Sequence, residues 1–127
     1  MNELYPVFLK VHQLETLLVG GGNVGLEKLT FLLKSSPKAK VTVVSKAFLK
    51  EIVTIAKDNS NIQLVNDAYK DHYLIEKHLV IAATDDKEVN KKVYTDAKKR
   101  FLLVNVADTP EYCDFYLGGI VTKGNIK

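Results

Sequence analysis

Residues 16–33, TLLVGGGNVGLEKLTFLL, decide the fold of this 127-residue chain. The stretch begins with an apolar run at residues 17–19 and continues into three consecutive glycines. Leucines then recur three or four residues apart, which is the spacing of one helix face. These apolar positions are Leu26, Leu29, Leu32 and Leu33. The order of the patterns predicts a strand, a tight turn and a helix over residues 24–34.

The glycines of the turn match the pattern G-x-G-x-x-G, and each has a separate task. Gly20 lets the chain turn sharply off the strand, Gly22 lets backbone approach a pyrophosphate, and Gly25 lets the helix pack close to the sheet. Free N–H groups at the helix start, near Asn23 and Val24, would hold the diphosphate together with the helix dipole. The pattern therefore predicts a dinucleotide site, although the same glycines also fit a turn that binds no ligand.

The sequence after the helix supports the dinucleotide site but leaves the coenzyme open. A second apolar run at residues 41–44 follows about twenty residues later, as a βαβ unit requires. NAD sites often place an acid after this second strand, and NADP sites often place an arginine nearby. This chain has Ser45, Lys46 and Ala47 there. The absent acid weakens an NAD assignment, and Lys46 leaves NADP open.

The remaining patterns predict an α/β fold of the Rossmann type, a doubly wound parallel sheet. Further strands are expected at residues 40–45, 62–65, 78–84 and 101–106, helices at 47–57 and from 85 or 86 to 99, and one helical turn within 68–76. Residues 4–11 contain Pro6 and are interpreted as an extended lead-in or edge segment. Helical crossovers on both sides of the first strand predict the strand order 3-2-1-4-5, with ligands at the carboxyl ends.

The end of the chain follows a different pattern. Residues 115–121, FYLGGIV, look extended, and a strand that starts a new layer there would leave apolar surface uncovered. We therefore expect residues 1–112 to form the nucleotide-binding domain and residues 113–127 to begin a further region. That region would be truncated here or covered by a partner chain.

Composition excludes several classes of protein. Eighteen Lys and Arg against fifteen Asp and Glu give a net charge of +3, too small to indicate nucleic acid. No apolar run reaches the roughly 20 residues that span a bilayer, so no membrane contact is expected, and the first residues lack a signal-peptide pattern. Together with a single cysteine, Cys113, interpreted as a small buried apolar residue, this favours a cytoplasmic protein. The scattered histidines show no metal-ligand spacing, and no resident metal is expected.

Two strand ends carry further candidate residues. Thr84 and Asp85 follow the most apolar strand and would cap the next helix, or contact the nicotinamide ribose and the adjoining phosphate. Asn105 and Asp108 end the fifth strand at the same edge as the glycine turn. Asp-Thr-Pro is a good turn sequence, and local pattern alone favours that role for Asp108. A carboxylate at this place would also suit a general base.

Five blocks of the sequence together resemble the siroheme-synthase amino-terminal family. These blocks are YPVFLK at 5–10, LLVGGGNVGLEK at 17–28, VTVVS at 41–45, VIAATDDKEVN at 80–90 and LVNVADTPEYCDF at 103–115. The family comprises precorrin-2 dehydrogenases, some of which are also sirohydrochlorin ferrochelatases. The resemblance implies NAD as coenzyme, precorrin-2 as substrate, sirohydrochlorin and NADH as products, and Fe²⁺ as a further substrate in bifunctional members.

The resemblance also assigns residues. Asp108 matches the family's essential aspartate, a general base for oxidation and a proton acceptor during iron insertion, and Asn105 would orient the substrate. Coenzyme contacts are expected from Gly20, Gly22, Asn23, Val24, Gly25, Ser45, Lys46, Ala47 and Thr84. Family members often have proline where this chain has Lys46, and they continue into a dimerisation region and a helical tail. The resemblance implies that residues 113–127 are the first strands of a dimerisation and substrate region, and that the protein is a homodimer through the region after residue 112.

A second hypothesis comes from another class of protein. Nucleotide-sensing regulatory domains of potassium transport systems contain a segment that resembles residues 80–90. Those domains usually carry an acid after the second strand, where this chain has Ser45, and they have no reason for the pattern at residues 105–115. The motifs therefore favour the enzyme.

Overall fold

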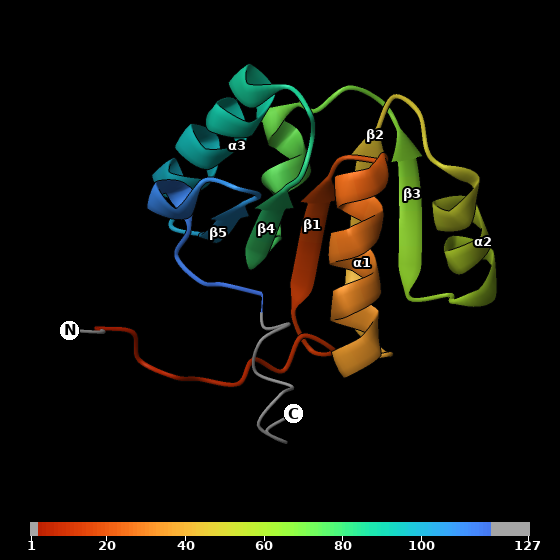
Figure 1. The fold of residues 1–127 in the computed structure, drawn as a ribbon, viewed down its shortest axis with the longest axis horizontal. Coiled ribbons are helices and arrows are strands. Elements are labelled where there is room, and N and C mark those ends of the chain that lie inside the picture. Colours follow the sequence, from red (N-terminus) through yellow and green to blue (C-terminus); the bar gives the residue numbers. More distant parts are fainter. Residues whose placement is uncertain (1–2, 118–127) are drawn as a thin grey trace.

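A computed structural model describes residues 3–117 as an α/β fold around one five-stranded sheet (Figure 1). All strand pairs are parallel and the order is β3-β2-β1-β4-β5, which confirms the predicted topology. The strands are β1 (Glu15–Val19), β2 (Lys40–Ser45), β3 (Ile62–Asn66), β4 (Leu79–Ala82) and β5 (Leu103–Val106). The helices are α1 (Asn23–Ser35), α2 (Lys50–Asp58) and α3 (Lys87–Lys99), with 3-10 turns η1 (Asp71–Leu74) and η2 (Pro110–Tyr112).

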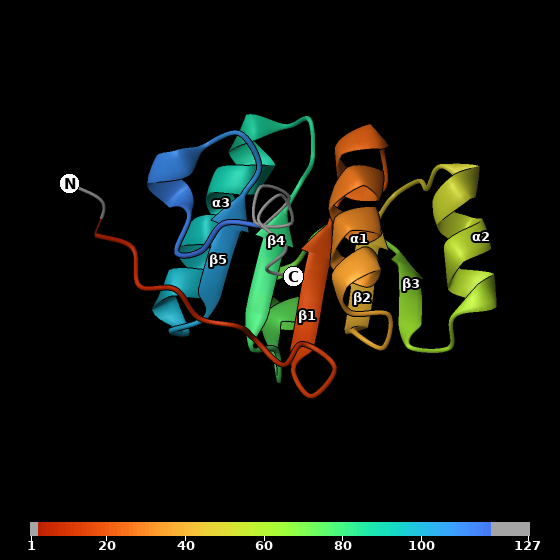
Figure 2. The ribbon, with the colours of Figure 1, turned by 60° about the horizontal axis from the view of Figure 1, so that its bottom comes forward.

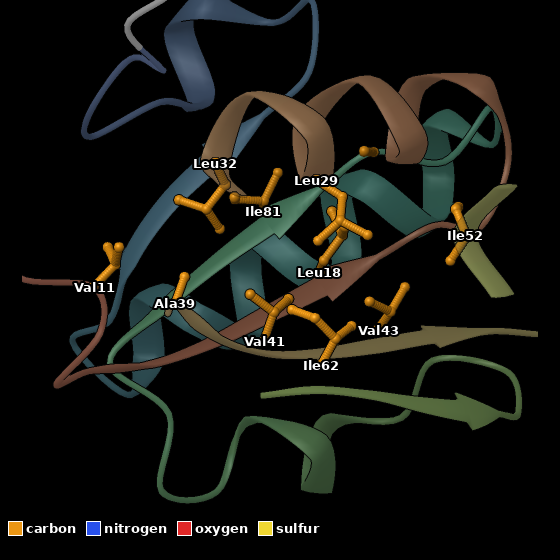
Figure 3. Close-up of a cluster of buried hydrophobic side chains, with 11 residues drawn as sticks. Val11, Leu18, Leu29, Leu32, Ala39, Val41, Val43, Ile52, Ile62 and Ile81 are labelled. Atoms are coloured by element: carbon orange, nitrogen blue, oxygen red, sulfur yellow. The ribbon is translucent and has the colours of Figure 1, made fainter. Parts of the chain in front are cut away.

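Apolar side chains bury both faces of the sheet. Helices α1 and α2 cover one face, and α3 with η1 covers the other (Figures 1 and 2). Successive residues of a strand point to opposite faces, so Leu17 and Leu18 of β1 belong to different clusters. Figure 3 shows Leu18 and Ile81 of the sheet beneath Leu29 of α1. Short apolar strands buried on both sides are typical of an all-parallel sheet, as the sequence predicted.

Helix α2 begins three residues later than predicted, because residues 46–49 fold back over the glycine turn. The Leu49 N–H donates to the Gly21 carbonyl at 2.9 Å, and the Ser45 hydroxyl donates to the Ala47 carbonyl at 2.7 Å. These bonds hold Leu49 in an extended conformation, so the helix starts at Lys50. Residues 3–10 form no strand, which excludes the predicted edge segment and leaves the extended lead-in.

The outer edge of β5 is covered by residues 113–115. The Cys113 thiol donates to the Val106 carbonyl at 3.2 Å and accepts from its N–H at 3.3 Å. The Asp114 N–H donates to the Val104 carbonyl at 2.7 Å, and its carboxylate accepts from the Val104 N–H at 3.0 Å and from Lys98 at 2.6 Å. This segment therefore satisfies backbone groups that an edge strand would otherwise expose.

Two predictions concern the end of the chain: the structure corrects the one for Cys113 and leaves the one for the domain division untested. The side chain is half-buried and hydrogen-bonded, so the expectation of a small buried apolar residue was wrong. Burial raises the pKa of its thiol, which keeps the proton that the Val106 carbonyl accepts. Residues 118–121 of the expected strand lie outside the described residues, and the division into 1–112 and 113–127 stays a prediction.

Two tyrosine–aspartate pairs fix the connection between β3 and β4. The Tyr69 hydroxyl donates to Asp96 of α3 at 2.9 Å, and Lys92 donates to the same carboxylate at 3.0 Å. Burial alone would raise the pKa of Asp96, but the hydrogen bonds from Lys92 and Tyr69 outweigh it and leave that pKa below its ordinary value. Asp67 receives the Tyr73 hydroxyl and the Lys70 ammonium, which lower the pKa of its carboxyl in the same way.

These two acids predict a loss of stability in acid. An acid with a lowered folded-state pKa contributes stability above its unfolded pKa of about 3.9, and that contribution disappears as pH falls through the folded value. We expect the Asp96→Asn variant to lose less stability than the wild type below about pH 4. Urea unfolding followed by circular dichroism between neutral and acid pH measures this difference. Asp58→Asn, at an exposed position on α2, is the control, and an equal acid slope for Asp96→Asn and wild type would contradict the prediction.

Candidate functional site

The candidate site lies where the carboxyl ends of the five parallel strands meet, at the upper edge of the sheet in Figure 1. The chain leaves β1 toward β2 through α1 and later returns to β4 on the other side of β1, so the order reverses between β1 and β4. Ligands of doubly wound sheets bind at such a switch point. The predicted site residues lie in the loops after β1, β2, β4 and β5, in the adjoining strands β2 and β5, and in the first turn of α1.

Two glycines of the turn are required by the fold itself. Gly20 has φ +134°, and a Cβ atom there would lie 2.3 Å from the Ala83 carbonyl oxygen at the end of β4. A Cβ atom on Gly25 would lie 2.3 Å from the Gly20 carbonyl oxygen, so α1 packs directly on the turn. Both positions are consistent with the tasks that the sequence assigned to them.

Gly22 differs, because nothing in the fold requires it. A Cβ atom there would meet no atom within 4 Å, and the residue is exposed. The empty space is what a ligand approaching the backbone needs. Gly21 was missed by the sequence analysis: its Cβ would lie 2.3 Å from the Ala47 carbonyl oxygen. Gly21 was visible in the sequence as part of the glycine triplet, but its contact with Ala47 depends on the folding back of residues 46–49.

The amino end of α1 is open to an anion. Gly22 is the N-cap, no side chain caps the helix, and its first turn has no acid. The first intrahelical bond is from the Leu26 N–H to the Gly22 carbonyl, so the N–H groups of Asn23, Val24 and Gly25 have no acceptor within the helix. Such groups, together with the helix dipole, attract phosphate. The residues present therefore fit the diphosphate of a dinucleotide.

The amino end of α3 is capped by the side chain of Asp86, the residue before the helix. The Asp86 carboxylate accepts from the N–H groups of Glu88 and Val89, at 2.9 and 3.3 Å. The predicted cap at Thr84 or Asp85 was therefore wrong by one or two residues. The Thr84 hydroxyl instead accepts from the Asp86 N–H at 3.1 Å. Because Asp86 occupies the first N–H groups of α3, α1 offers the better anion site.

The loop after β4 is held by an amide that the sequence analysis did not single out. The Asn90 Oδ1 atom accepts from the Thr84 N–H at 3.2 Å and from its hydroxyl at 2.6 Å, and the Asn90 Nδ2 group donates to the Thr84 carbonyl at 3.1 Å. Asn90 is only 6% exposed. The signal available in the sequence was a polar residue between the apolar helix positions Val89 and Val93. That pattern is too common to indicate a buried asparagine.

The residues after β2 form a short turn beside the glycine loop. The Ser45 hydroxyl is bound to the Ala47 carbonyl, and the Lys46 side chain is exposed. The Asn66 amide at the end of β3 donates to the Lys46 carbonyl at 2.7 Å and fixes this turn. Asp67 lies next to it, but its carboxylate is bound to Tyr73 and Lys70.

The turn after β5 presents one free carboxylate. Its N–H to carbonyl bond joins Thr109 to Val106 at 3.2 Å and places Asp108 in the left-handed region, with φ +59°. Aspartate tolerates this conformation better than most residues. The Asp108 side chain is exposed and makes no hydrogen bond or ion pair with any residue between 3 and 117. The predicted turn thus leaves the carboxylate available for chemistry.

Asn105 lies on β5 and contacts Phe115 of the segment that follows η2. The side chain is 5% exposed, its Nδ2 group donates to the Phe115 carbonyl at 2.9 Å, and its Oδ1 atom has no partner within the described part of the chain. A buried acceptor without a partner costs about 1–3 kcal/mol, so this atom is poised to accept a hydrogen bond. Neighbouring strands lie about 4.8 Å apart, which puts the end of β5 roughly 10 Å from the glycine turn.

Residues 3–117 contain neither a metal-binding cluster nor a membrane-spanning helix. No group of three or more His, Cys, Asp and Glu side chains in this part of the chain could hold a metal ion. None of its helices is both long enough and apolar enough to cross a membrane.

Comparison with known proteins agrees with this geometry. Residues 7–119 match the model of a family described as "Putative NAD(P)-binding". The siroheme synthases of Psychrobacter cryohalolentis and Nitrosomonas europaea are 34% and 35% identical to this chain over 96% and 95% of its length, and that of Methylococcus capsulatus is 38% identical over 95%. These matches cover 23%, 25% and 25% of the relatives, so the chain spans about a quarter of their length.

A solved structure gives the same answer. "SirC, precorrin-2 dehydrogenase" aligns with a TM-score of 0.70 and 26% identity, over 92% of this chain and 53% of that one. The resemblance to the siroheme-synthase amino-terminal family that the sequence predicted is thus confirmed. Because the family model matches residues 7–119, which are most of the chain, the chain belongs to the family described as "Putative NAD(P)-binding".

Proposed function

We propose that this chain is the coenzyme-binding domain of an NAD-dependent precorrin-2 dehydrogenase in siroheme biosynthesis. The observation that carries the proposal is the single sheet edge at which an uncapped helix end, an open space over Gly22 and the free carboxylate of Asp108 occur together. The relatives, which are siroheme synthases and a precorrin-2 dehydrogenase, supply the substrate class.

The proposed coenzyme lies across the switch point. The N–H groups of residues 23–25 bind its diphosphate, and the open space over Gly22 lets the backbone approach it. Residues 45–47 border the adenosine ribose, and Thr84 borders the nicotinamide half. When bound, NAD⁺ supplies the acceptor for two electrons and one hydrogen.

Asp108 is proposed as the general base. Dehydrogenation of precorrin-2 removes one hydrogen with two electrons, which reduces NAD⁺ to NADH, and one proton. The Asp108 carboxylate takes that proton, since it is exposed and has no competing cation among residues 3–117. Asn105 is proposed to orient the substrate: its Nδ2 group is bound to the Phe115 carbonyl, and its buried Oδ1 atom has no hydrogen-bond partner among the described residues.

Two finer assignments rest on the family resemblance. NAD⁺ is proposed over NADP⁺, although Lys46 after β2 is a cation that a 2′-phosphate would accept. Insertion of Fe²⁺ into sirohydrochlorin is proposed as a second activity, with Asp108 receiving the protons that the macrocycle nitrogens release. The regulatory domain of a potassium transport system is the weaker alternative, because the relatives reported above are siroheme synthases and a dehydrogenase.

Two measurements test the proposal. Calorimetric titration of the chain with NAD⁺ and NADP⁺ is expected to show binding, with NAD⁺ the tighter ligand. Precorrin-2 and NAD⁺ added to the full-length protein that contains this domain are expected to give one NADH, measured by its absorbance, for each sirohydrochlorin formed. Absence of binding of either coenzyme would overturn the coenzyme site, and binding of NAD⁺ without turnover of precorrin-2 would overturn the substrate assignment.

A further inference from the structure

The loop after β4 touches the glycine turn closely. The Ala83 N–H donates to the Val19 carbonyl at 2.8 Å, and a Cβ atom on Gly20 would lie 2.3 Å from the Ala83 carbonyl oxygen and 3.3 Å from the Thr84 nitrogen. These contacts leave little free space between the two loops. The position of Thr84 therefore determines the shape of the site on the β4 side of the glycine turn.

Asn90 fixes that position through three hydrogen bonds to one residue. Its Oδ1 atom uses both lone pairs, for the N–H and the hydroxyl of Thr84, and its Nδ2 group donates to the Thr84 carbonyl. An aspartate would lack the donor, and an aliphatic residue would leave the Thr84 backbone groups unpaired. The amide is thus suited to orient a single residue of the loop completely.

The cap of α3 needs Asn90 much less. Asp86 itself supplies the two capping bonds, to Glu88 and Val89. The direct contribution of Asn90 to the helix start is its own N–H, which donates to the Asp86 carbonyl at 3.1 Å, as in any helix. Its side chain acts on the cap only indirectly, through the Thr84 hydroxyl that bonds to the Asp86 backbone. The three side-chain hydrogen bonds of Asn90 all go to Thr84 in the loop.

We infer that Asn90 is a positioning residue for the coenzyme: without touching it, Asn90 holds Thr84 and the loop after β4 against the glycine turn, so that the nicotinamide half meets a preformed wall. The inference rests on the proposed function. A preformed wall reduces the ordering that binding would otherwise require, and this appears as tighter binding.

A matched control exists at the opposite edge of the sheet. The Asn61 Nδ2 group donates to the carbonyl oxygens of Pro37 and Ala39, at 3.0 and 2.6 Å, and so joins two loops at the amino ends of the strands. Asn61→Ala removes side-chain-to-backbone bonds of the same kind as Asn90→Ala but far from the candidate site. Both variants are compared with wild type at a temperature where circular dichroism shows them folded.

The expected result is a separation of stability from affinity. Both alanine variants lower the melting temperature, but only Asn90→Ala raises the Kd for NAD⁺, by about tenfold. Asn90→Asp, which keeps the acceptor and loses the donor, is expected to lie between Asn90→Ala and wild type. Hydrogen exchange is expected to accelerate at residues 83–86 in Asn90→Ala and to stay unchanged there in Asn61→Ala.

Each contrary outcome has a distinct meaning. A wild-type chain that binds no nicotinamide coenzyme overturns the proposed function. Wild-type binding together with an unchanged Kd for Asn90→Ala, or with an equal rise for Asn61→Ala, overturns the role of Asn90 in binding. Unchanged exchange at residues 83–86 in Asn90→Ala overturns the positioning of the loop, whether or not coenzyme binds.

Discussion

Asp108→Asn is expected to lower kcat for precorrin-2 dehydrogenation by about 10² to 10⁴-fold, the usual contribution of a general base, and to leave the Kd for NAD⁺ unchanged. Asparagine keeps the shape of the side chain and tolerates the left-handed φ of +59° equally well. The variant therefore removes the proton acceptor without disturbing the turn. The measurement is NADH absorbance in the presence of precorrin-2 and saturating NAD⁺.

The controls separate charge from fold. Asp108→Ala should lose the same activity and in addition about 1 kcal/mol of stability, because alanine is disfavoured at positive φ. Glu111→Gln removes an exposed acid three residues away in η2 and should keep full activity. Activity that persists in Asp108→Asn would remove the general-base assignment, since a water or another group would then receive the proton.

Alanine substitutions at the three motif glycines are expected to lower the free energy of unfolding by different amounts. Gly20→Ala should lose about 3 kcal/mol or more, because it combines positive φ with a clash against the Ala83 carbonyl. Gly25→Ala should lose about 1–3 kcal/mol through its clash with the Gly20 carbonyl. Gly22→Ala should lose about 1 kcal/mol or less, since its Cβ meets nothing.

Gly22→Ala, the variant expected to lose the least stability, is expected to lose affinity for NAD⁺. Gly22→Ala stays folded, but its methyl group occupies the space through which backbone would approach the diphosphate, and the Kd for NAD⁺ is expected to rise at least about tenfold. Urea unfolding gives the stabilities, and calorimetric titration gives the affinity. A Gly22→Ala protein that binds NAD⁺ as tightly as wild type would show that the diphosphate does not lie over this residue.

The sequence predicted the sheet and its order well, for a physical reason. Each strand is a short apolar run, and this is the pattern of strands that helices bury on both faces in an all-parallel sheet. Helix α1 was predicted within one residue at each end, because its leucines have strict helical spacing and Gly22 and Ser36 flank it. Local periodicity was sufficient wherever burial alone decided the structure.

The sequence did not predict features that depend on a contact between distant segments. The start of α2 was missed because the apolar pattern of residues 47–57 continues through Phe48 and Leu49, whereas the Leu49 N–H is bound to Gly21. Asn90 was missed, and the hydrogen bonds of Cys113 were not predicted, because a side chain that binds backbone leaves no periodic pattern in the sequence. The turn that contains Asp108 was predicted, since a strand end and the sequence Asp-Thr-Pro are both local patterns.

The covering of β5 by Cys113 has a practical consequence for anyone who would attach a spectroscopic probe to this protein. The thiol of Cys113, the only cysteine of the chain, pairs with the N–H and carbonyl of Val106 at the edge of the sheet, as a backbone amide of a further strand would. Burial raises the pKa of this thiol, which keeps it protonated and therefore slow to react with maleimides. A dye forced onto this sulfur would displace the border segment that holds Asp114 and Phe115. Fluorescent labelling is better directed to a cysteine introduced on the outer face of α2.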